Sequence, residues 1–465
     1  MSGELRRVLG LRAGLDYRGA LQAATEGVSA LESDPSREPR ELTLLLLELG
    51  RLQDEFGRYR EAEEAYRRAA LVAREITVRP EGEVLEGLAL GRAVGVLRTQ
   101  GRPRDAEGLL PEALALAESG SRRDGPELAE VLVELGRLLQ DLDDYRQAEP
   151  MLRRAVDLAE RAPDGLAGRG ALVRALGGLG SSLRAQGRFE EAEALFRRAL
   201  AGAEQAFGRD SLEVSYVLND FGILCKFWGR FEQGKPLYER SLRILERAVG
   251  TEHPDVASLY HNLGGLEHAR GDFAAAEPYA RRSVEIRERT MGPDHLKTAA
   301  DRAALASILD GLGRRDEAEA LLRSALEVIE RTYGPEHYEV AVNLNNLGAI
   351  AQRRGDLAEA EALYRRALAI KEKVLRPGSP EVAFTLNNLG LLCKLQGRYE
   401  EAESLYRRAL EILEPAVDPL HPNLAACLAN YASLLKLVGR EAEAEPLAAR
   451  ARAIDEARSE EVSGR

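Results

Sequence analysis

Hydrophobic and polar positions recur along the chain with a period close to 42 residues. The period is marked by a glycine, or a residue in its place, followed five residues later by a small residue. These markers are Gly57, Gly101, Asp143, Gly187, Gly229, Gly271, Gly313, Gly355, Gly397 and Gly439. Leu15 with Ala20 gives one earlier match. A fixed period of this length is typical of a repeat protein in which each unit is one supersecondary element.

Each unit predicts two helices. After the marker Gly355, the small residues Ala360 and Ala367 flank the bulky Tyr364 at spacings that place all three on one helical face. Small residues on such a face let another helix approach closely. Before the marker, apolar residues at helical spacing predict a helix from about Val340 to Arg353, which the glycine then ends. No alternating run bounded by hairpin turns is found, so we predict a chain of helices and turns.

At equivalent positions of successive units the chain carries Leu-Gly, Gly-x-aromatic, Ala, and an aromatic residue followed by Ala. This pattern resembles the tetratricopeptide repeat. The 42-residue unit also resembles the repeat of kinesin light chains and their bacterial relatives, through the stretches HPDVASLYHNLGGL (253–266), HYEVAVNLNNLGAI (337–350) and SPEVAFTLNNLGLL (379–392). The resemblance covers nearly the whole chain. It implies an all-α, right-handed α-solenoid of about ten helix pairs preceded by one N-terminal helix. The coiled-coil heptads and motor-binding segment of a kinesin light chain have no counterpart in this sequence.

Composition narrows the classes of partner. The net charge is −12, which disfavours a surface for nucleic acid or anionic membrane. The opening MSGELRRVLG lacks the apolar core of a signal peptide, and no run approaches the ~20 apolar residues of a membrane span. We therefore predict a cytoplasmic protein. Its arginine-rich, lysine-poor composition indicates a GC-rich bacterial genome.

Motifs that suggest chemistry coincide with the repeat period. The run from Gly229 to Lys235 matches the first seven positions of a phosphate-binding loop, but Pro236 stands where Ser or Thr is required. One histidine recurs once per repeat, and because such positions lie ~10 Å apart they cannot surround a single zinc ion, so we predict turn or cap residues there. This column of histidines is His253, His295, His337 and His421. The cysteines predict small buried residues in a reducing compartment; they are Cys225, Cys393 and Cys427. We predict no catalytic residue, no metal and no cofactor, and hence no enzyme.

The later units differ from the earlier ones in carrying amides on the first helix of each pair. These amides lie two or three residues before a glycine inside that helix, Gly348 in the unit of Gly355, or before the residue in its place. They are Asn219, Asn262, Asn345, Asn346, Asn387, Asn388 and Asn430. The resemblance implies that this helix lines the concave face. An amide both donates and accepts, so such a ladder suits the backbone of an extended peptide. The alternative is that the amides bond within the packing between repeats, and both interpretations remain open.

A basic edge accompanies the ladder. Lys226, Lys394 and Lys436 lie four residues after the helix glycine or its equivalent. Beside amides, in an acidic protein, they favour an acidic ligand or a C-terminal carboxylate. The alternative is an ordinary solvated charged face. One unit also gathers four aromatic residues, which form either extra core or an exposed hot spot for a partner: Tyr216, Phe221, Phe227 and Trp228.

These patterns divide the chain by composition into residues 1–208 without the ladder, residues 209–458 with ladder and basic edge, and a disordered tail at 459–465. We predict a scaffold or adaptor that binds a peptide or partner segment in the concave groove. The alternative function is a regulatory, inhibitory subunit of a bacterial signalling or defence effector, such as a protease or NTPase.

Overall fold

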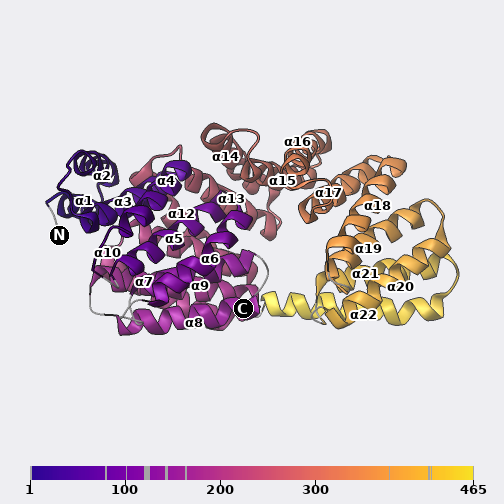
Figure 1. Cartoon of the computed structure of the whole chain (residues 1–465). Coiled ribbons are helices and arrows are strands. Elements are labelled where there is room, and N and C mark those ends of the chain that lie inside the picture. The colour runs from indigo at the N-terminus through magenta and orange to yellow at the C-terminus, as the bar shows by residue number, and fades with distance from the viewer. Residues whose placement is uncertain are drawn as a thin grey trace. The chain divides into compact units, whose positions relative to one another are not determined.

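The computed structural model describes residues 3–78, 81–100, 102–119, 126–141, 145–162, 165–375, 378–416, 419 and 421–463. All regular elements within these residues are α-helices, numbered α1 to α22. The chain divides into two compact units, Met1–Arg270 and Gly271–Arg465. Figure 1 shows the helices of each unit stacked side by side in chain order. The predicted all-α solenoid is confirmed.

The first unit begins with a helical pair, α1 (Gly3–Ala13) and α2 (Tyr17–Glu32). The later helices follow in order: α3 (Pro39–Glu55), α4 (Tyr59–Ala73), α5 (Glu81–Thr99), α6 (Pro103–Ser119), α7 (Pro126–Asp141), α8 (Tyr145–Arg161), α9 (Leu166–Ala185), α10 (Phe189–Phe207), α11 (Leu212–Phe227), α12 (Phe231–Val249) and α13 (Pro254–Arg270).

The second unit contains α14 (Phe273–Met291), α15 (Leu296–Gly311), α16 (Arg315–Tyr333), α17 (Tyr338–Arg354), α18 (Leu357–Val374), α19 (Pro380–Leu395), α20 (Tyr399–Ala416), α21 (Pro422–Leu437) and α22 (Glu441–Ser463). Along the chain, odd-numbered helices from α3 onward are the first helices of the repeats and even-numbered helices are the second. None of the helices in the described part of the chain is both long and apolar enough to cross a membrane.

Two details differ from the sequence predictions. The N-terminal extension is a pair of packed helices, α1 and α2, where one leading helix was predicted. Helix α22 continues to Ser463, beyond the predicted end near Arg458. The compact units meet at residue 270, whereas the boundary predicted at 208 marks a change in composition, which stays a prediction. The markers Gly101 and Asp143 lie outside the described residues.

A contact between glycine and tyrosine explains two of the sequence columns. A Cβ atom built on Gly348 would lie 2.8 Å from the ring of Tyr364, and one on Gly390 would lie 2.9 Å from the ring of Tyr406. Both tyrosines are fully buried. The first helix therefore needs glycine wherever the second helix presents a large ring. Where the ring is replaced by Leu322, the first helix has Ala306 instead.

The turn between the two helices of a repeat also follows from glycine. Gly355 has φ +92° and ends α17 in the left-handed conformation, and its N–H bonds the carbonyl oxygens of the last turn. The markers Gly57, Gly187, Gly229, Gly313, Gly397 and Gly439 likewise have positive φ. A side chain in this conformation would cost about 1 kcal/mol or more, so the period of the sequence is a period of turns.

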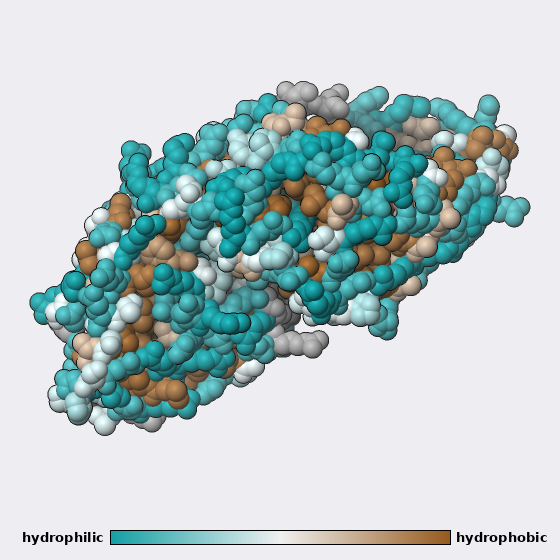
Figure 2. Space-filling view, turned by 90° about the horizontal axis from the view of Figure 1, so that it is seen from above, coloured by the Kyte–Doolittle hydropathy of each residue, from teal (hydrophilic) through white to brown (hydrophobic). Residues whose placement is uncertain are grey.

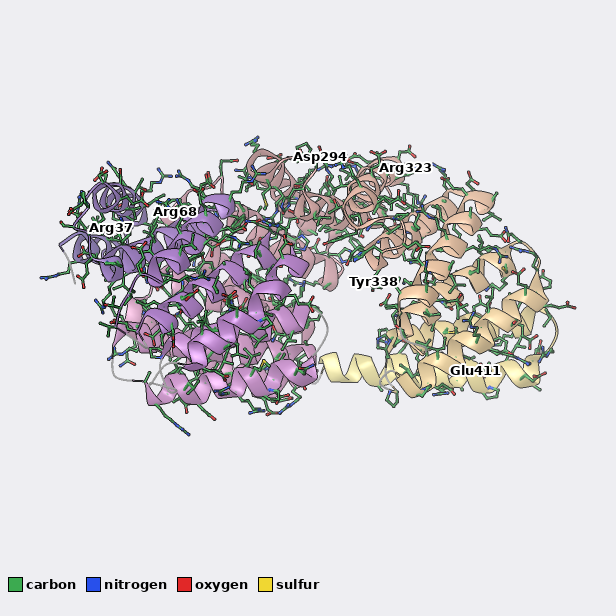
Figure 3. All side chains as sticks on the ribbon, viewed as in Figure 1. Arg37, Arg68, Asp294, Arg323, Tyr338 and Glu411 are labelled. Carbon is green, nitrogen blue, oxygen red and sulfur yellow. The ribbon has the colours of Figure 1, made fainter. Side chains whose placement is uncertain are left out.

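Ion pairs connect the second helices of neighbouring repeats on the outside of each unit. Arg68 of α4 pairs with Glu32 of α2, and Arg323 of α16 pairs with Glu359 of α18 (Figure 3). Such partly exposed pairs contribute little stability each, but together they keep the outer surface polar. The face seen in Figure 2 is accordingly mostly hydrophilic, with apolar side chains showing between the helices.

One ion pair is an exception because it is buried. Arg287 of α14 and Asp301 of α15 are each 3% exposed, and their Nε and Oδ2 atoms lie 3.0 Å apart. The hydroxyl of Ser283 donates to the same carboxylate at 2.6 Å. One repeat earlier in the sequence, the equivalent positions hold the buried Leu245 and Leu259. The pair therefore stands where the preceding repeat has two buried leucines.

Candidate functional site

The predicted asparagines form hydrogen bonds from repeat to repeat. In the second unit, Asn388 donates from Nδ2 to Oδ1 of Asn345 at 3.3 Å, and Asn430 donates in the same way to Asn387 at 3.0 Å. All four side chains are half-buried. Every side-chain amide has two donor hydrogens and two acceptor lone pairs. Each bond uses one hydrogen of one asparagine and one lone pair of the other.

The first unit contains one step of the same pattern. Asn262 of α13 donates to Oδ1 of Asn219 on α11 at 2.8 Å, and Asn219 donates to Asp220 at 3.2 Å. Burial raises the pKa of Asp220, and Arg137 and Arg184 oppose this increase. The ladder thus links consecutive first helices in both units.

The ladder is interrupted between these two runs. At the corresponding positions of α15 the chain carries Ala303 and Ala304, so Asn346 lacks the amide that its counterparts bond in the preceding repeat. Asn346 is half-buried, and within the described residues its side chain makes no hydrogen bond. Among the amides of the second unit, it therefore keeps all of its hydrogen-bonding groups available.

The three predicted lysines have unequal surroundings. Lys394 is half-buried and donates to the hydroxyl of Ser433 at 3.2 Å, and burial lowers its pKa. Lys436 is exposed and lies 3.6 Å from a carboxylate oxygen of Glu445. Burial, and secondarily Arg184, lowers the pKa of Lys226 in the first unit. Of the three lysines, only Lys436 is exposed, and it is close to a carboxylate.

The histidine column caps helices, as predicted. Nδ1 of His295 accepts the backbone N–H of Lys297 at 3.1 Å, and Nδ1 of His337 accepts that of Glu339 at 3.2 Å. His253 and His421 make the same contact at 3.1 Å. Because Nδ1 accepts a hydrogen bond, these rings carry no proton there. Burial, with Lys297 and Arg287, lowers the pKa of His295.

The run that resembles a phosphate-binding loop serves the repeat packing. Gly229 has φ +75° at the helix turn, and the Nζ atom of Lys235 lies 2.7 Å from the buried carboxylate of Glu267. Gly234 packs against Cys225 and Leu266. The three predicted cysteines are buried and free, as the sequence indicated.

The four aromatic residues of this repeat divide between core and surface. Phe221 is buried and stacks on Phe196 with ring centroids 5.9 Å apart. Trp228 is half-buried against Phe189. Phe227 is 59% exposed, under the guanidinium of Arg184, and Tyr216 is 39% exposed. Neither single alternative from the sequence describes the whole group.

The first unit closes on itself. Glu213, at the start of α11, pairs with Arg12 at 3.2 Å and with Arg51 at 2.7 Å. The N–H of Leu212 donates to the hydroxyl of Tyr17 at 3.1 Å. A Cβ atom built on Gly57 would lie 2.8 Å from Pro254 at the start of α13. Segments about two hundred residues apart therefore meet, and they enclose the interior of this unit.

Two cavities lie in this interior and share a wall of ion pairs. The first, of about 410 Å³, is lined largely by leucines, and the second, of about 480 Å³, is lined mainly by polar side chains. Arg51, Arg92, Glu130, Arg174 and Glu213 line both. Burial alone would raise the pKa of Glu130, but Arg174 and Arg92 outweigh it and bring the pKa to about 2.

The sequence analysis missed the residues that close and line these cavities. Glu213 gives no signal, because acidic residues in the first turn of a helix are common. Asp54 gives one: it occupies a column in which most repeats carry a basic residue or glutamine and only Asp310 is a second carboxylate. A carboxylate at a position that is mostly basic or amide indicates that this repeat has different surroundings there.

Family comparisons identify the repeat. Models of the tetratricopeptide repeat match residues 86–161, 172–247, 229–289, 255–328, 303–373 and 381–457, and further models of this repeat match 133–207 and 45–75. No curated protein matches the chain.

Several solved structures are similar. The kinesin light chain nearly identical TPR-like repeats from Podosopora anserina share 23% identity over 42% of this chain and 93% of theirs, with a TM-score of 0.38. BtubC (BKLC) from P. vanneervenii shares 25% identity over 58% and 90%, with a TM-score of 0.33. The apo quorum sensor NprR from B. thuringiensis shares 12% identity over 80% and 97%, with a TM-score of 0.55, a similarity of fold.

Proposed function

Because the chain belongs to the tetratricopeptide repeat family, we propose that it is a protein-interaction scaffold that holds an extended partner segment along its asparagine ladder. The proposal rests on one observation, the hydrogen bonding of the asparagine side chains in the ladder. In the second unit they bond one another between repeats, and within the described residues other donors and acceptors of the same amides make no hydrogen bond.

Hydrogen-bonding capacity supports a backbone ligand. Nδ2 of Asn345 and Oδ1 of Asn388 are not the atoms engaged in their mutual bond. A peptide backbone offers both a carbonyl and an N–H at each residue, so it can satisfy both kinds of group without a particular side chain. Bonding between the amides also fixes their rotamers, which reduces the entropy lost on binding.

The lysines favour an acidic segment or a C-terminal carboxylate. Lys394 and Lys436 belong to the same repeats as Asn387, Asn388 and Asn430. Burial lowers the pKa of Lys394, because its ammonium group is less well solvated than in water. A ligand carboxylate beside it would stabilise that charge. The ligand class is therefore a polar or acidic peptide segment, and no chemical step is part of the proposal.

Asn346 allows the binding role of the ladder to be separated from its structural role. Its replacement, Asn346→Ala, removes an amide that makes no bond to a neighbouring repeat, so the melting temperature should stay within about 2 °C of the wild type. If the amide bonds the partner, affinity should fall by ~2- to 12-fold, as expected for one hydrogen bond. The variant Asn388→Ala should lose both affinity and stability, because its amide also bonds Asn345.

The partner is identified by affinity capture from a lysate with wild-type protein and with the quadruple variant in which Asn345, Asn346, Asn387 and Asn388 are alanine. A matched control, Arg323→Ala, removes contacts between repeats on the outer face. A protein held by wild type and control but lost by the folded quadruple variant supports the groove. Equal capture by all three refutes it. If the partner is an enzyme, its activity with and without the scaffold tests the inhibitory-subunit alternative.

A further inference from the structure

The polar cavity of the first unit has more carboxylates than arginines. Its lining contains five arginines and seven carboxyl groups. The arginines all pair with glutamates: Arg51 with Glu55 and Glu213, Arg92 and Arg174 with Glu130, and Arg98 and Arg137 with Glu134. The aspartates of the cavity are Asp54, Asp220 and Asp255.

Two of these aspartates line the cavity from the two segments that come together where the unit closes. Asp54 lies at the end of α3 and Asp255 in the first turn of α13, next to the contact between Gly57 and Pro254. In the described part of the chain, neither side chain has an ion pair or a hydrogen bond. Their charges are therefore not compensated by a basic group in direct contact.

A third carboxylate has an unsatisfied atom at the same place. Glu55 is 7% exposed and lines the cavity, and its Oε1 bonds Arg51. Its Oε2 is buried and, among the described residues, has no hydrogen-bond partner. A buried carboxylate oxygen without a donor is destabilising, and a ligand N–H group could supply that donor.

Aromatic rings complete the lining near these carboxylates. Tyr59 and Tyr216 both line the cavity, and Tyr216 is 39% exposed although it lies in the interior of the unit. Burial, and after it the carboxylates of Asp255, Glu55 and Asp54, raise the pKa of Tyr216. The face of a tyrosine ring attracts cations, and carboxylates reinforce that attraction.

From this arrangement we infer that the polar cavity of the first unit binds an organic cation, a molecule with an ammonium or guanidinium group placed between Asp54, Asp255 and the ring of Tyr216. Such a group supplies the N–H donor that Oε2 of Glu55 lacks among the described residues, and a positive charge beside Asp54 and Asp255. A cavity of about 480 Å³ accommodates a molecule of small-ligand size. No set of three or more His, Cys, Asp or Glu ligands suited to a metal ion occurs in the described residues.

Proton release accompanies the binding. Burial, with Asp255, Glu55 and Glu134, raises the pKa of Asp54 to about 7, and Arg92 opposes this shift. A bound cation favours the ionised carboxylate, so binding below this pH displaces a proton from Asp54. Affinity therefore increases as the pH rises through 7, since the proton competes with the ligand.

The test is calorimetric titration of the full chain at physiological salt with two probes. Spermidine represents a free polyamine, and N-acetylarginine amide represents a basic side chain with a charge that is constant between pH 6 and pH 8. We expect at least one probe to bind. The arginine probe, if it binds, should bind up to ~10-fold more tightly at pH 8 than at pH 6, because the ionised fraction of Asp54 changes by that factor.

Variants distinguish the cavity from general attraction to an acidic protein. Asp54→Asn/Asp255→Asn should lower affinity at least ~10-fold, while Asp105→Asn/Asp210→Asn, which removes the same charge from the exposed surface, should leave it unchanged. Tyr216→Leu should weaken binding by several fold without changing its pH dependence. Equal losses in both double variants, or no binding of either probe to the wild type, would overturn the inference. Circular dichroism of each variant confirms that it is folded.

Discussion

The buried ion pair between α14 and α15 offers a direct test of how much charge contributes to the packing of these repeats. We consider the single change Asp301→Leu and the double change Arg287→Leu/Asp301→Leu. The double change introduces leucine at both positions, as the preceding repeat has at the equivalent Leu245 and Leu259. Adding Ser283→Ala removes the hydroxyl that would otherwise lose its acceptor.

The expected magnitudes follow from burial. Both partners are 3% exposed, so the single change takes the carboxylate away from a buried guanidinium. Breaking a buried pair in this way costs ~3–5 kcal/mol, whereas replacing the whole pair by packed apolar groups is often neutral or stabilising by ~1–4 kcal/mol. In a unit of this size, ~2–4 °C of melting temperature correspond to 1 kcal/mol, which predicts a fall of ~6–20 °C for the single variant.

Thermal and urea unfolding, followed by far-UV circular dichroism, measure these effects. The single variant should unfold first, and the double and triple variants should regain at least the stability of the wild type. A double variant as unstable as the single one would refute the reasoning, because the packing of α14 on α15 would then require the charges themselves. A single variant of wild-type stability would show that water or another group solvates Arg287.

Two further predictions concern the helix contacts and caps. Gly348→Ala should lower the free energy of unfolding by ~1–3 kcal/mol through overpacking against Tyr364, and Tyr364→Leu should restore most of it, as in the natural pair of Ala306 and Leu322; no recovery in urea unfolding would contradict this. The cap of His295 is a neutral ring with a lowered pKa, so its stabilisation is present above about pH 6.5 and is lost as the pH falls through the folded-state pKa. His295→Asn keeps a capping acceptor and should reduce the loss of stability between pH 7 and pH 5; identical pH profiles would show that the ring does not titrate.

The asparagine ladder illustrates how far sequence reasoning reaches into the site. The spacing located Asn345, Asn387 and Asn388 on successive first helices, because a fixed period places equivalent residues on equivalent faces. The sequence could not show that Asn388 of one repeat bonds Asn345 of the previous one. That bond depends on the offset between neighbouring helices, which packing sets and no local pattern encodes. Whether the remaining amide groups also bind a partner stays a prediction.

By itself, the sequence determined the local architecture of this protein. Helical spacing, turn glycines, the match between Gly348 and Tyr364 and the capping histidines all act within one repeat or between neighbours, so the period carries them. The tertiary structure alone decided that Glu213 meets Arg12 and Arg51, and that Asp54 lies near Asp255. These contacts arise because small rotations between successive repeats accumulate until distant segments meet, and the sum of such rotations is not written in any one of them.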